Sequence, residues 1–201
     1  MSRLLLRLVT KYAQASNTCD SSSITSNNDT TTSSKTKASL IGIKLRYCSE
    51  LVTDEVLLSL SSIKTMQDIH LGGLRNISIN NMIQMFNILG NQVTRVFLHD
   101  MDLVNDNVMA ALGDLDNLYL VKLELLHTVT DQGIQTLVDK KTGAPQKLVI
   151  LEVTGCNLIT ENCIQYTREK IKTIRFNSLY SEYYITKAKK GYYVSRSPWY
   201  R

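Results

Sequence analysis

Few residues of this chain could do chemistry, and their spacing does not assemble a reactive centre. His70 and His99 occupy similar places in two apolar segments, so they could approach each other with Asp100 beside them. Imidazole and carboxylate groups bind zinc, but Asp100 is expected in a turn, which leaves the two histidines without a third ligand. No serine or cysteine follows a nucleophile-elbow pattern, and we predict a protein that is not an enzyme and needs no metal or cofactor.

Glycine and cysteine patterns support the same view. The glycine pair at 72–73 is followed by no Lys-Ser/Thr, so we interpret it as a tight passage from a strand to a turn and not as a phosphate loop. The cysteines form no CxxC pair and have no closely placed histidine. They are Cys19, Cys48, Cys156 and Cys163. We therefore expect reduced thiols in an intracellular compartment instead of a disulfide or zinc framework.

The net charge of +5 comes from the two ends of the chain. Residues 1–39 hold five basic and two acidic side chains, and residues 178–201 hold five basic and one acidic. The 138 residues between them hold 13 basic and 15 acidic side chains, which gives no support for a nucleic acid as the partner. No apolar run approaches the roughly 20 residues that span a bilayer, so we expect no transmembrane segment.

A repeated pattern begins at Leu40. Its unit is apolar-x-x-apolar-x-apolar-x-x-apolar, followed by a short polar turn and an amphipathic helical stretch. Five copies begin at Leu40, Met66, Val93, Leu118 and Leu148, and an incomplete sixth begins at Ile171. The third apolar residues of successive copies lie 26, 27, 25, 30 and 23 residues apart, and we attribute the 30-residue spacing to a loop at residues 140–145.

The physics of the repeat predicts the architecture. The alternating apolar core of each copy is a short strand, and the Thr-Asp, Asn-Asp or Thr-Glu pair that follows in four of the copies is a helix N-cap. One strand and one helix cannot close a core alone, so neighbouring copies must stack. We therefore predict an α/β solenoid, a right-handed arc with a parallel sheet on its concave side and helices on its convex side.

Two segments carry a family resemblance. Residues 47–54 (YCSELVTD) and 154–161 (TGCNLITE) resemble the cysteine-containing leucine-rich repeat, and residues 129–134 (VTDQGI) are similar to the same consensus after its cysteine. The likeness covers about residues 40–176 and implies a leucine-rich-repeat solenoid with a ribonuclease-inhibitor-like arc. In this family the cysteine, here Cys48 and Cys156, helps to close the turn after the strand. Leu74, Met101 and Leu126 replace it in the other copies.

The resemblance also implies a function. This repeat subtype is typical of F-box/leucine-rich-repeat substrate receptors of ubiquitin ligases and of small relatives without the F-box. The resemblance therefore implies a partner-recognition adaptor of the cytoplasm or nucleus. Residues 1–39 resemble no F-box, so the resemblance does not extend to direct recruitment of a ligase scaffold. The size and layout are also similar to mitochondrial leucine-rich-repeat proteins of the ATP synthase subunit s (coupling factor B) and complex I assembly group. The alternatives are thus a mitochondrial structural or assembly factor of a respiratory complex or ATP synthase, and a free-standing regulatory binder.

The regions outside the repeats divide into three segments. We predict that residues 1–15 form a basic amphipathic helix that is either a solenoid cap or a mitochondrial transit peptide. We predict a disordered linker rich in Ser, Thr and Asn for residues 16–39, and the repeat domain for residues 40–177. Residues 178–201 are a basic, aromatic tail that includes a predicted hairpin. The tail either caps the last repeat or serves as a docking arm for a large complex, an RNA or an acidic partner.

We expect the partner, another protein and not a small-molecule substrate, to bind the concave face of the sheet. The residues between the inward positions of the strands are Lys44, His70, Phe97, Lys122, Glu152 and Arg175. Flanking outward positions add Arg46, Arg95, His99, Tyr119 and Glu124. Phe97, an exposed aromatic among charges of both signs, is the expected anchor, because aromatic and Arg side chains carry much of the affinity of protein interfaces. A solvated face without a dedicated partner is the alternative.

Overall fold

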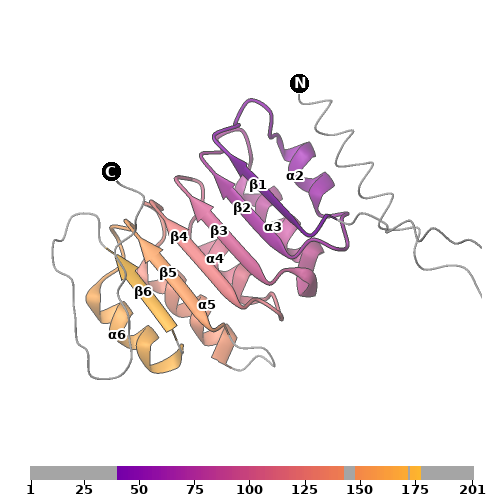
Figure 1. The fold of residues 1–201 in the computed structure, drawn as a ribbon. Coiled ribbons are helices and arrows are strands. Elements are labelled where there is room, and N and C mark those ends of the chain that lie inside the picture. The colour runs from indigo at the N-terminus through magenta and orange to yellow at the C-terminus, as the bar shows by residue number, and fades with distance from the viewer. Residues whose placement is uncertain (1–39, 143–147, 172, 178–201) are drawn as a thin grey trace, which may run out of the picture.

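The computed structural model describes residues 40–142, 148–171 and 173–177. Six parallel strands form one sheet in which the strand order follows the chain order (Figure 1). The strands are β1 (Gly42–Arg46), β2 (Asp68–Gly72), β3 (Arg95–His99), β4 (Leu120–Glu124), β5 (Ile150–Thr154) and β6 (Thr173–Asn177). The predicted N-terminal helix, the linker and the C-terminal hairpin lie outside the described residues.

A helix follows each of the first five strands. The helices are α2 (Asp54–Leu60), α3 (Ile79–Leu89), α4 (Asp106–Gly113), α5 (Asp131–Thr142) and α6 (Glu161–Lys170), and the short 3-10 helix η1 (Gly90–Gln92) continues α3. All of them lie together behind the sheet in Figure 1, so the other sheet face carries no helix of the described ranges. The predicted α/β class with a parallel sheet is confirmed.

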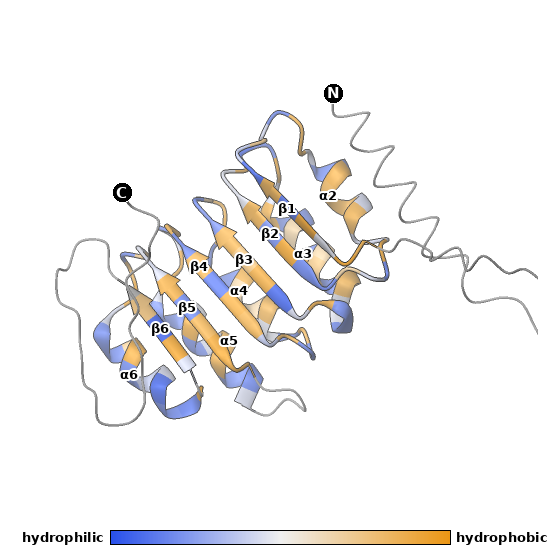
Figure 2. Cartoon of the chain, in the orientation of Figure 1, coloured by the Kyte–Doolittle hydropathy of each residue, from blue (hydrophilic) through white to orange (hydrophobic). Residues whose placement is uncertain are grey.

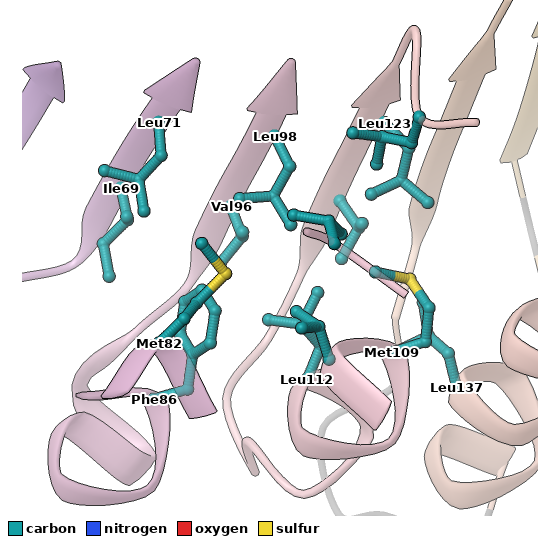
Figure 3. Close-up of a cluster of buried hydrophobic side chains, with 14 of the residues drawn as sticks. Ile69, Leu71, Met82, Phe86, Val96, Leu98, Met109, Leu112, Leu123 and Leu137 are labelled. Carbon is teal, nitrogen blue, oxygen red and sulfur yellow. The ribbon is translucent and has the colours of Figure 1, made fainter. Parts of the chain in front are cut away.

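The core lies between the sheet and the helices. Alternate strand residues point toward the helices and align across the sheet, as Ile69, Val96, Val121 and Leu151 do, all of them buried. The helices meet them with Met82, Phe86, Met109, Leu112 and Leu137 (Figure 3). Hydrophobic and hydrophilic residues accordingly alternate along the strands (Figure 2). Every repeat shares this core with its neighbours, which is why an isolated strand and helix would not hold together.

The same turn closes each of the first five strands. The residue directly after the strand has a positive φ in every case, and these residues are Tyr47, Gly73, Asp100, Leu125 and Gly155. In the first four of these turns the N–H of that residue donates to the last carbonyl of the next strand, as from Tyr47 to Gly72 at 2.8 Å and from Leu125 to Thr154 at 2.9 Å. Glycine adopts this conformation freely, and the predicted tight passage at residues 72–73 is confirmed.

Cys48 and Cys156 lie in these turns, as the family resemblance implies. Cys156 is buried, and its thiol lies 3.9 Å from the carbonyl of Leu123 and 3.8 Å from that of Thr154. Cys48 is half-buried, and its carbonyl accepts the N–H of Val52 at 3.1 Å. The buried thiol therefore contacts the backbone of its own strand and of the neighbouring one.

The helix N-caps agree with the sequence in part. Asn105 and Thr160 accept hydrogen bonds from the first turns of α4 and α6, at 3.0 and 3.4 Å. Thr53 makes no side-chain cap to α2, so that expectation is wrong. The first turn of α2 instead carries Asp54 and Glu55, whose negative charges are favourable at a helix N-terminus.

The expected loop at residues 140–145 is also wrong in its first half, because α5 continues to Thr142. Lys140 places its ammonium group 2.7 Å from the Asp114 carboxylate, and the buried Lys141 donates to the carbonyl of Leu115. Both lysines therefore bind α5 to the end of α4 in the preceding repeat. Desolvation by burial lowers the pKa of Lys141. Residues 143–147 lie outside the described ranges.

Candidate functional site

The candidate site is the sheet face opposite the helices, which we call the open face. Strand alternation places three residues of each strand on it, and the register aligns these residues in three rows across the sheet. The central row comprises Lys44, His70, Phe97, Lys122, Glu152 and Arg175, in line from β1 to β6. Sequence analysis predicted this row in full, because the buried positions on either side of each residue fix which way it points.

Two further rows flank the central row. The row toward the carboxyl ends of the strands comprises Arg46, Gly72, His99, Glu124, Thr154 and Asn177. The row toward the amino ends comprises Gly42, Asp68, Arg95, Leu120, Ile150 and Thr173. Four of the five predicted flanking residues, Arg46, Arg95, His99 and Glu124, are therefore on the open face.

Tyr119 is the exception among the predicted flanking residues. Leu120, and not Tyr119, pairs with Arg95 in the register. Tyr119 precedes β4 at the amino edge of the sheet, where it is exposed and lines a shallow polar groove with Thr94 and Asn117. The prediction placed this residue one position out of the strand alternation, so it belongs to the edge and not to the open face.

An aromatic stack occupies the centre of the β2–β3 pair. The rings of His70 and Phe97 lie 3.8 Å apart with an angle of 19° between their planes. Phe97 is therefore half-buried and not fully exposed as expected, because His70 covers part of its ring. Desolvation and the positive charge of Lys44 lower the pKa of His70, which favours the uncharged imidazole in this stack.

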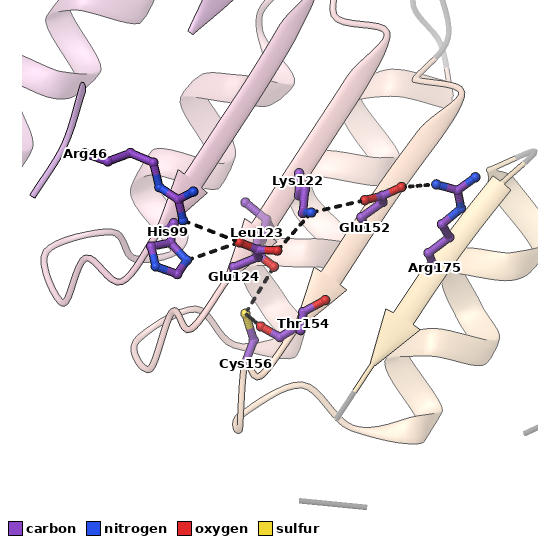
Figure 4. Close-up of polar contacts among 9 residues, drawn as sticks. All are labelled: Arg46, His99, Lys122, Leu123, Glu124, Glu152, Thr154, Cys156 and Arg175. Atoms are coloured by element: carbon purple, nitrogen blue, oxygen red, sulfur yellow. Dashed lines mark hydrogen bonds and ion pairs between the residues drawn. The ribbon is translucent and has the colours of Figure 1, made fainter. Parts of the chain in front are cut away.

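A network of ion pairs extends across the open face from Arg46 of β1 to Arg175 of β6 (Figure 4). The Glu124 carboxylate lies 2.9 Å from the Lys122 ammonium group, 3.1 Å from the Nδ1 atom of His99 and 3.9 Å from the Arg46 guanidinium group. Lys122 also lies 3.8 Å from Glu152, which in turn pairs with Arg175. Burial alone would raise the pKa of Glu124, but the hydrogen bond and charge of Lys122, with His99 and Arg46, leave it below its ordinary value.

Gly72 and Gly73 make the β1 end of this network possible. A Cβ atom on Gly72 would lie 3.3 Å from the Arg46 side chain, and one on Gly73 would overlap the ring of Tyr47. The missing side chains thus leave room for Arg46 and Tyr47 to lie across β2. Tyr47 reaches the Nε2 atom of His99 at 2.6 Å, and Arg46 reaches toward Glu124.

Besides two glycines and Thr154, Thr173 and Asn177, sequence reasoning missed four contributors to the open face. Asp68, Leu120 and Ile150 could have been found by extending the strand alternation by one step toward the amino end. Tyr47 had no such signal, because it lies in a turn with a φ of 54° and its reach depends on the glycine beneath it. The face is therefore broader and more apolar at its amino side than the sequence suggested.

The hypothetical two-histidine site is not assembled. His70 pairs with Phe97 in the register, while His99 directs one ring nitrogen to Tyr47 and the other to Glu124. Among residues 40–142, 148–171 and 173–177, no group of three His, Cys, Asp or Glu side chains could hold a metal ion. No helix within the same ranges has the length and apolar character needed to cross a membrane.

Comparison of the chain with protein-family models and with curated proteins gave no match. The case for a function therefore rests on the open face itself. Its arrangement of fixed ion pairs, a stacked aromatic pair and neighbouring apolar side chains is suited to contact with a second molecule.

Proposed function

We propose that this chain is a leucine-rich-repeat solenoid and a non-enzymatic protein-binding module, whose open face is the concave surface that receives the partner. The solenoid assignment is supported by the strand order, which follows the chain order, and by the shared turn with a positive φ after each of five strands. The residues of the repeat recur at matching points of the register, as stacked copies of one unit require.

One observation carries the binding role. All-parallel sheets are normally covered on both faces, whereas the helices of the described residues lie on one face only (Figure 1). A face of this kind needs either solvent-exposed polar groups or a partner, and the open face carries Phe97, Leu120 and Ile150, none of them fully exposed. We place the partner over these side chains.

The polar groups of the open face are preorganised for binding. Glu124 and Glu152 are held by cations from both sides, and their side chains are only 26% and 18% exposed. A partner would therefore meet side chains whose positions are already fixed, which reduces the entropy lost on binding. Tyr47 and Arg46 add two residue types that often dominate the affinity of interfaces.

The test is affinity purification of the tagged full chain from cells, followed by mass spectrometry, for the wild type and for Phe97→Ala/Arg95→Ala. We expect the double variant to lose the partners that the wild type recovers. The control is Ile88→Ala, which removes an exposed apolar side chain from α3 on the opposite side of the sheet. Full retention of the same partners by the double variant would exclude the open face as the binding surface.

The identity of the recovered proteins distinguishes the biological roles. We propose the ubiquitin-ligase adaptor role first, because the residues at 47–54 and 154–161 resemble the repeat subtype of those receptors. Recovery of ligase scaffold subunits that depends on the chain would support it. Recovery of respiratory-complex or ATP synthase subunits, together with mitochondrial imaging of the tagged chain, would support the assembly-factor role instead.

A further inference from the structure

The open face holds its cations and its carboxylates at different depths. Asp68 pairs with Arg95, and the aspartate side chain is 18% exposed whereas the arginine is 52% exposed. Glu152 and Arg175 form a similar pair, in which the glutamate side chain is 18% exposed and the arginine side chain is 50% exposed. In both pairs the carboxylate lies beneath and the guanidinium group faces outward, so an approaching molecule meets positive charge first.

The excess of positive charge is greatest at the β1 end. The open face carries the cations Lys44, Arg46, Arg95, Lys122 and Arg175 and the carboxylates Asp68, Glu124 and Glu152. Lys44 is exposed and forms no ion pair with the described residues, and Arg46 reaches its only carboxylate at 3.9 Å. Every described carboxylate of the face, by contrast, already has a cation. Charge complementarity therefore favours a partner with acidic side chains over β1.

An apolar patch lies beside this excess charge. Phe97 is in the central row, and Leu120 and Ile150 follow on the next two strands in the neighbouring row. Lys44 and Phe97 are two strands apart in the same row, which is about 10 Å at the usual strand spacing. An extended chain spans that distance in about three residues.

We infer that the open face binds an extended acidic segment of a partner protein, with an apolar side chain on Phe97, Leu120 and Ile150 and a carboxylate about three residues away on Lys44 and Arg46. This inference rests on the proposed protein-binding function and names the chemistry of its occupant. A protein segment is favoured over a nucleic acid because the 138 residues of the repeat region carry a net charge of −2. A repeat region with this net charge provides no long-range attraction for a polyanion.

The test is selection from a display library of random peptides of about ten residues, long enough to cross the six strands, with the full chain as the bait. The wild type should enrich peptides in which Asp or Glu stands two to four positions from Leu, Ile, Phe, Tyr or Trp. Lys44→Glu/Arg46→Glu should lower the affinity for those peptides at least tenfold, and 1 M salt should weaken binding by the wild type.

Matched variants separate the parts of the inference. Lys64→Glu makes the same charge reversal at an exposed lysine between α2 and β2, outside the open face, and should leave the selection unchanged. Phe97→Ala should keep the preference for acids but lose the preference for an apolar residue. Circular dichroism of each variant establishes that the chain is folded before its selection is compared.

Three results would overturn the inference. Enrichment of neutral or basic peptides, or of acidic peptides that Lys44→Glu/Arg46→Glu binds equally well, would exclude the proposed chemistry. Failure to enrich any peptide would exclude an extended segment as the occupant. Tight binding of a fluorescent oligouridine that Lys44→Glu/Arg46→Glu abolishes would make the occupant a nucleic acid. None of these results alone decides the protein-binding function, which the affinity purification tests separately.

Discussion

Asp106, at the start of α4, accepts two hydrogen bonds from Thr130, which stands directly before α5: the N–H at 2.8 Å and the hydroxyl at 2.6 Å. Asp131 repeats this relationship with Thr160 one unit later, where the N–H lies at 2.7 Å. Asp54 likewise accepts the N–H of Ser78 at 2.6 Å. The first residue of one helix thus fixes the cap of the next, and this contact joins neighbouring repeats outside the hydrophobic core.

Replacement of Asp106 should therefore weaken the junction between two repeats. Asp106→Ala leaves the half-buried Thr130 without its acceptor, and we expect a loss of about 1–3 kcal/mol in the free energy of unfolding. Chemical denaturation measures this loss. Asp102→Ala is the control, because Asp102 is exposed and its ion pair with Arg75 should contribute less than about 1 kcal/mol. Equal effects of the two variants would contradict the assigned role of Asp106.

Two helix glycines should respond to alanine to different degrees. A Cβ atom on Gly133 would overlap the carboxylate of Asp106, so Gly133→Ala should destabilise the fold by displacing that group from Thr130. A Cβ atom on Gly113 would lie 2.7 Å from Cδ and 3.1 Å from Cβ of Lys140 and would disturb the lysine that pairs with Asp114. Gly113→Ala should therefore destabilise the fold less than Gly133→Ala, because the alanine's higher helix propensity offsets part of this cost. Thermal unfolding of both variants tests the prediction, and a stabilised Gly133→Ala would refute it.

The His70–Phe97 stack should make stability depend on pH. Desolvation by burial lowers the pKa of His70, and so do the positive charges of Lys44, Arg95 and Arg46. The negative charge of Asp68 opposes this shift without cancelling it. The folded chain then binds fewer protons than the unfolded chain below the ordinary histidine pKa of about 6.5, and its stability falls as the pH decreases.

His70→Phe keeps an aromatic ring on Phe97 and removes this titration. We expect a shallower loss of the free energy of unfolding between about pH 7 and pH 5 for the variant than for the wild type. Urea denaturation at a series of pH values measures both curves. Parallel curves would mean that His70 does not lose its proton on folding.

The cysteines should differ in their reactivity. Burial raises the pKa of Cys163 to about 11 and also raises the pKa of Cys156 and of Cys48, but Cys48 is only half-buried whereas the other two are buried. Iodoacetamide should therefore modify Cys48 of the folded chain well before Cys156 and Cys163, because the exposed thiolate is the reactive form. Peptide mass spectrometry measures the rates, and in guanidinium chloride all three should react alike. Equal rates in the folded chain would contradict this burial.

The sequence predicted the parts of this structure that follow from periodicity. The central row from Lys44 to Arg175 was predictable because each member stands between two apolar residues that must point toward the helices. The error at Tyr119 arose at a strand boundary, where the alternation stops and carries no more information. Boundaries are the least determined feature of a periodic pattern.

Contacts between side chains of different repeats were not predictable. The Thr-Asp pair at 130–131 indicates a helix start, but nothing in it shows that Asp106, 24 residues earlier, reaches the cap residue. The partial burial of Phe97 depends on the rotamer of His70, and the reach of Tyr47 depends on Gly73. These relationships arise only when the strands are brought side by side.

The most direct test of the central claim, that the open face receives a protein partner, is site-specific photo-crosslinking in cells. A photo-reactive phenylalanine analogue replaces Thr154 on the open face in one full-length chain and Ile88 on the outer surface of α3 in another. We expect the chain with the analogue at position 154 to capture covalently the partner protein that affinity purification of the wild type recovers. The chain with the analogue at position 88 should capture none. Capture from position 88 alone would place the partner on the helices and contradict the account.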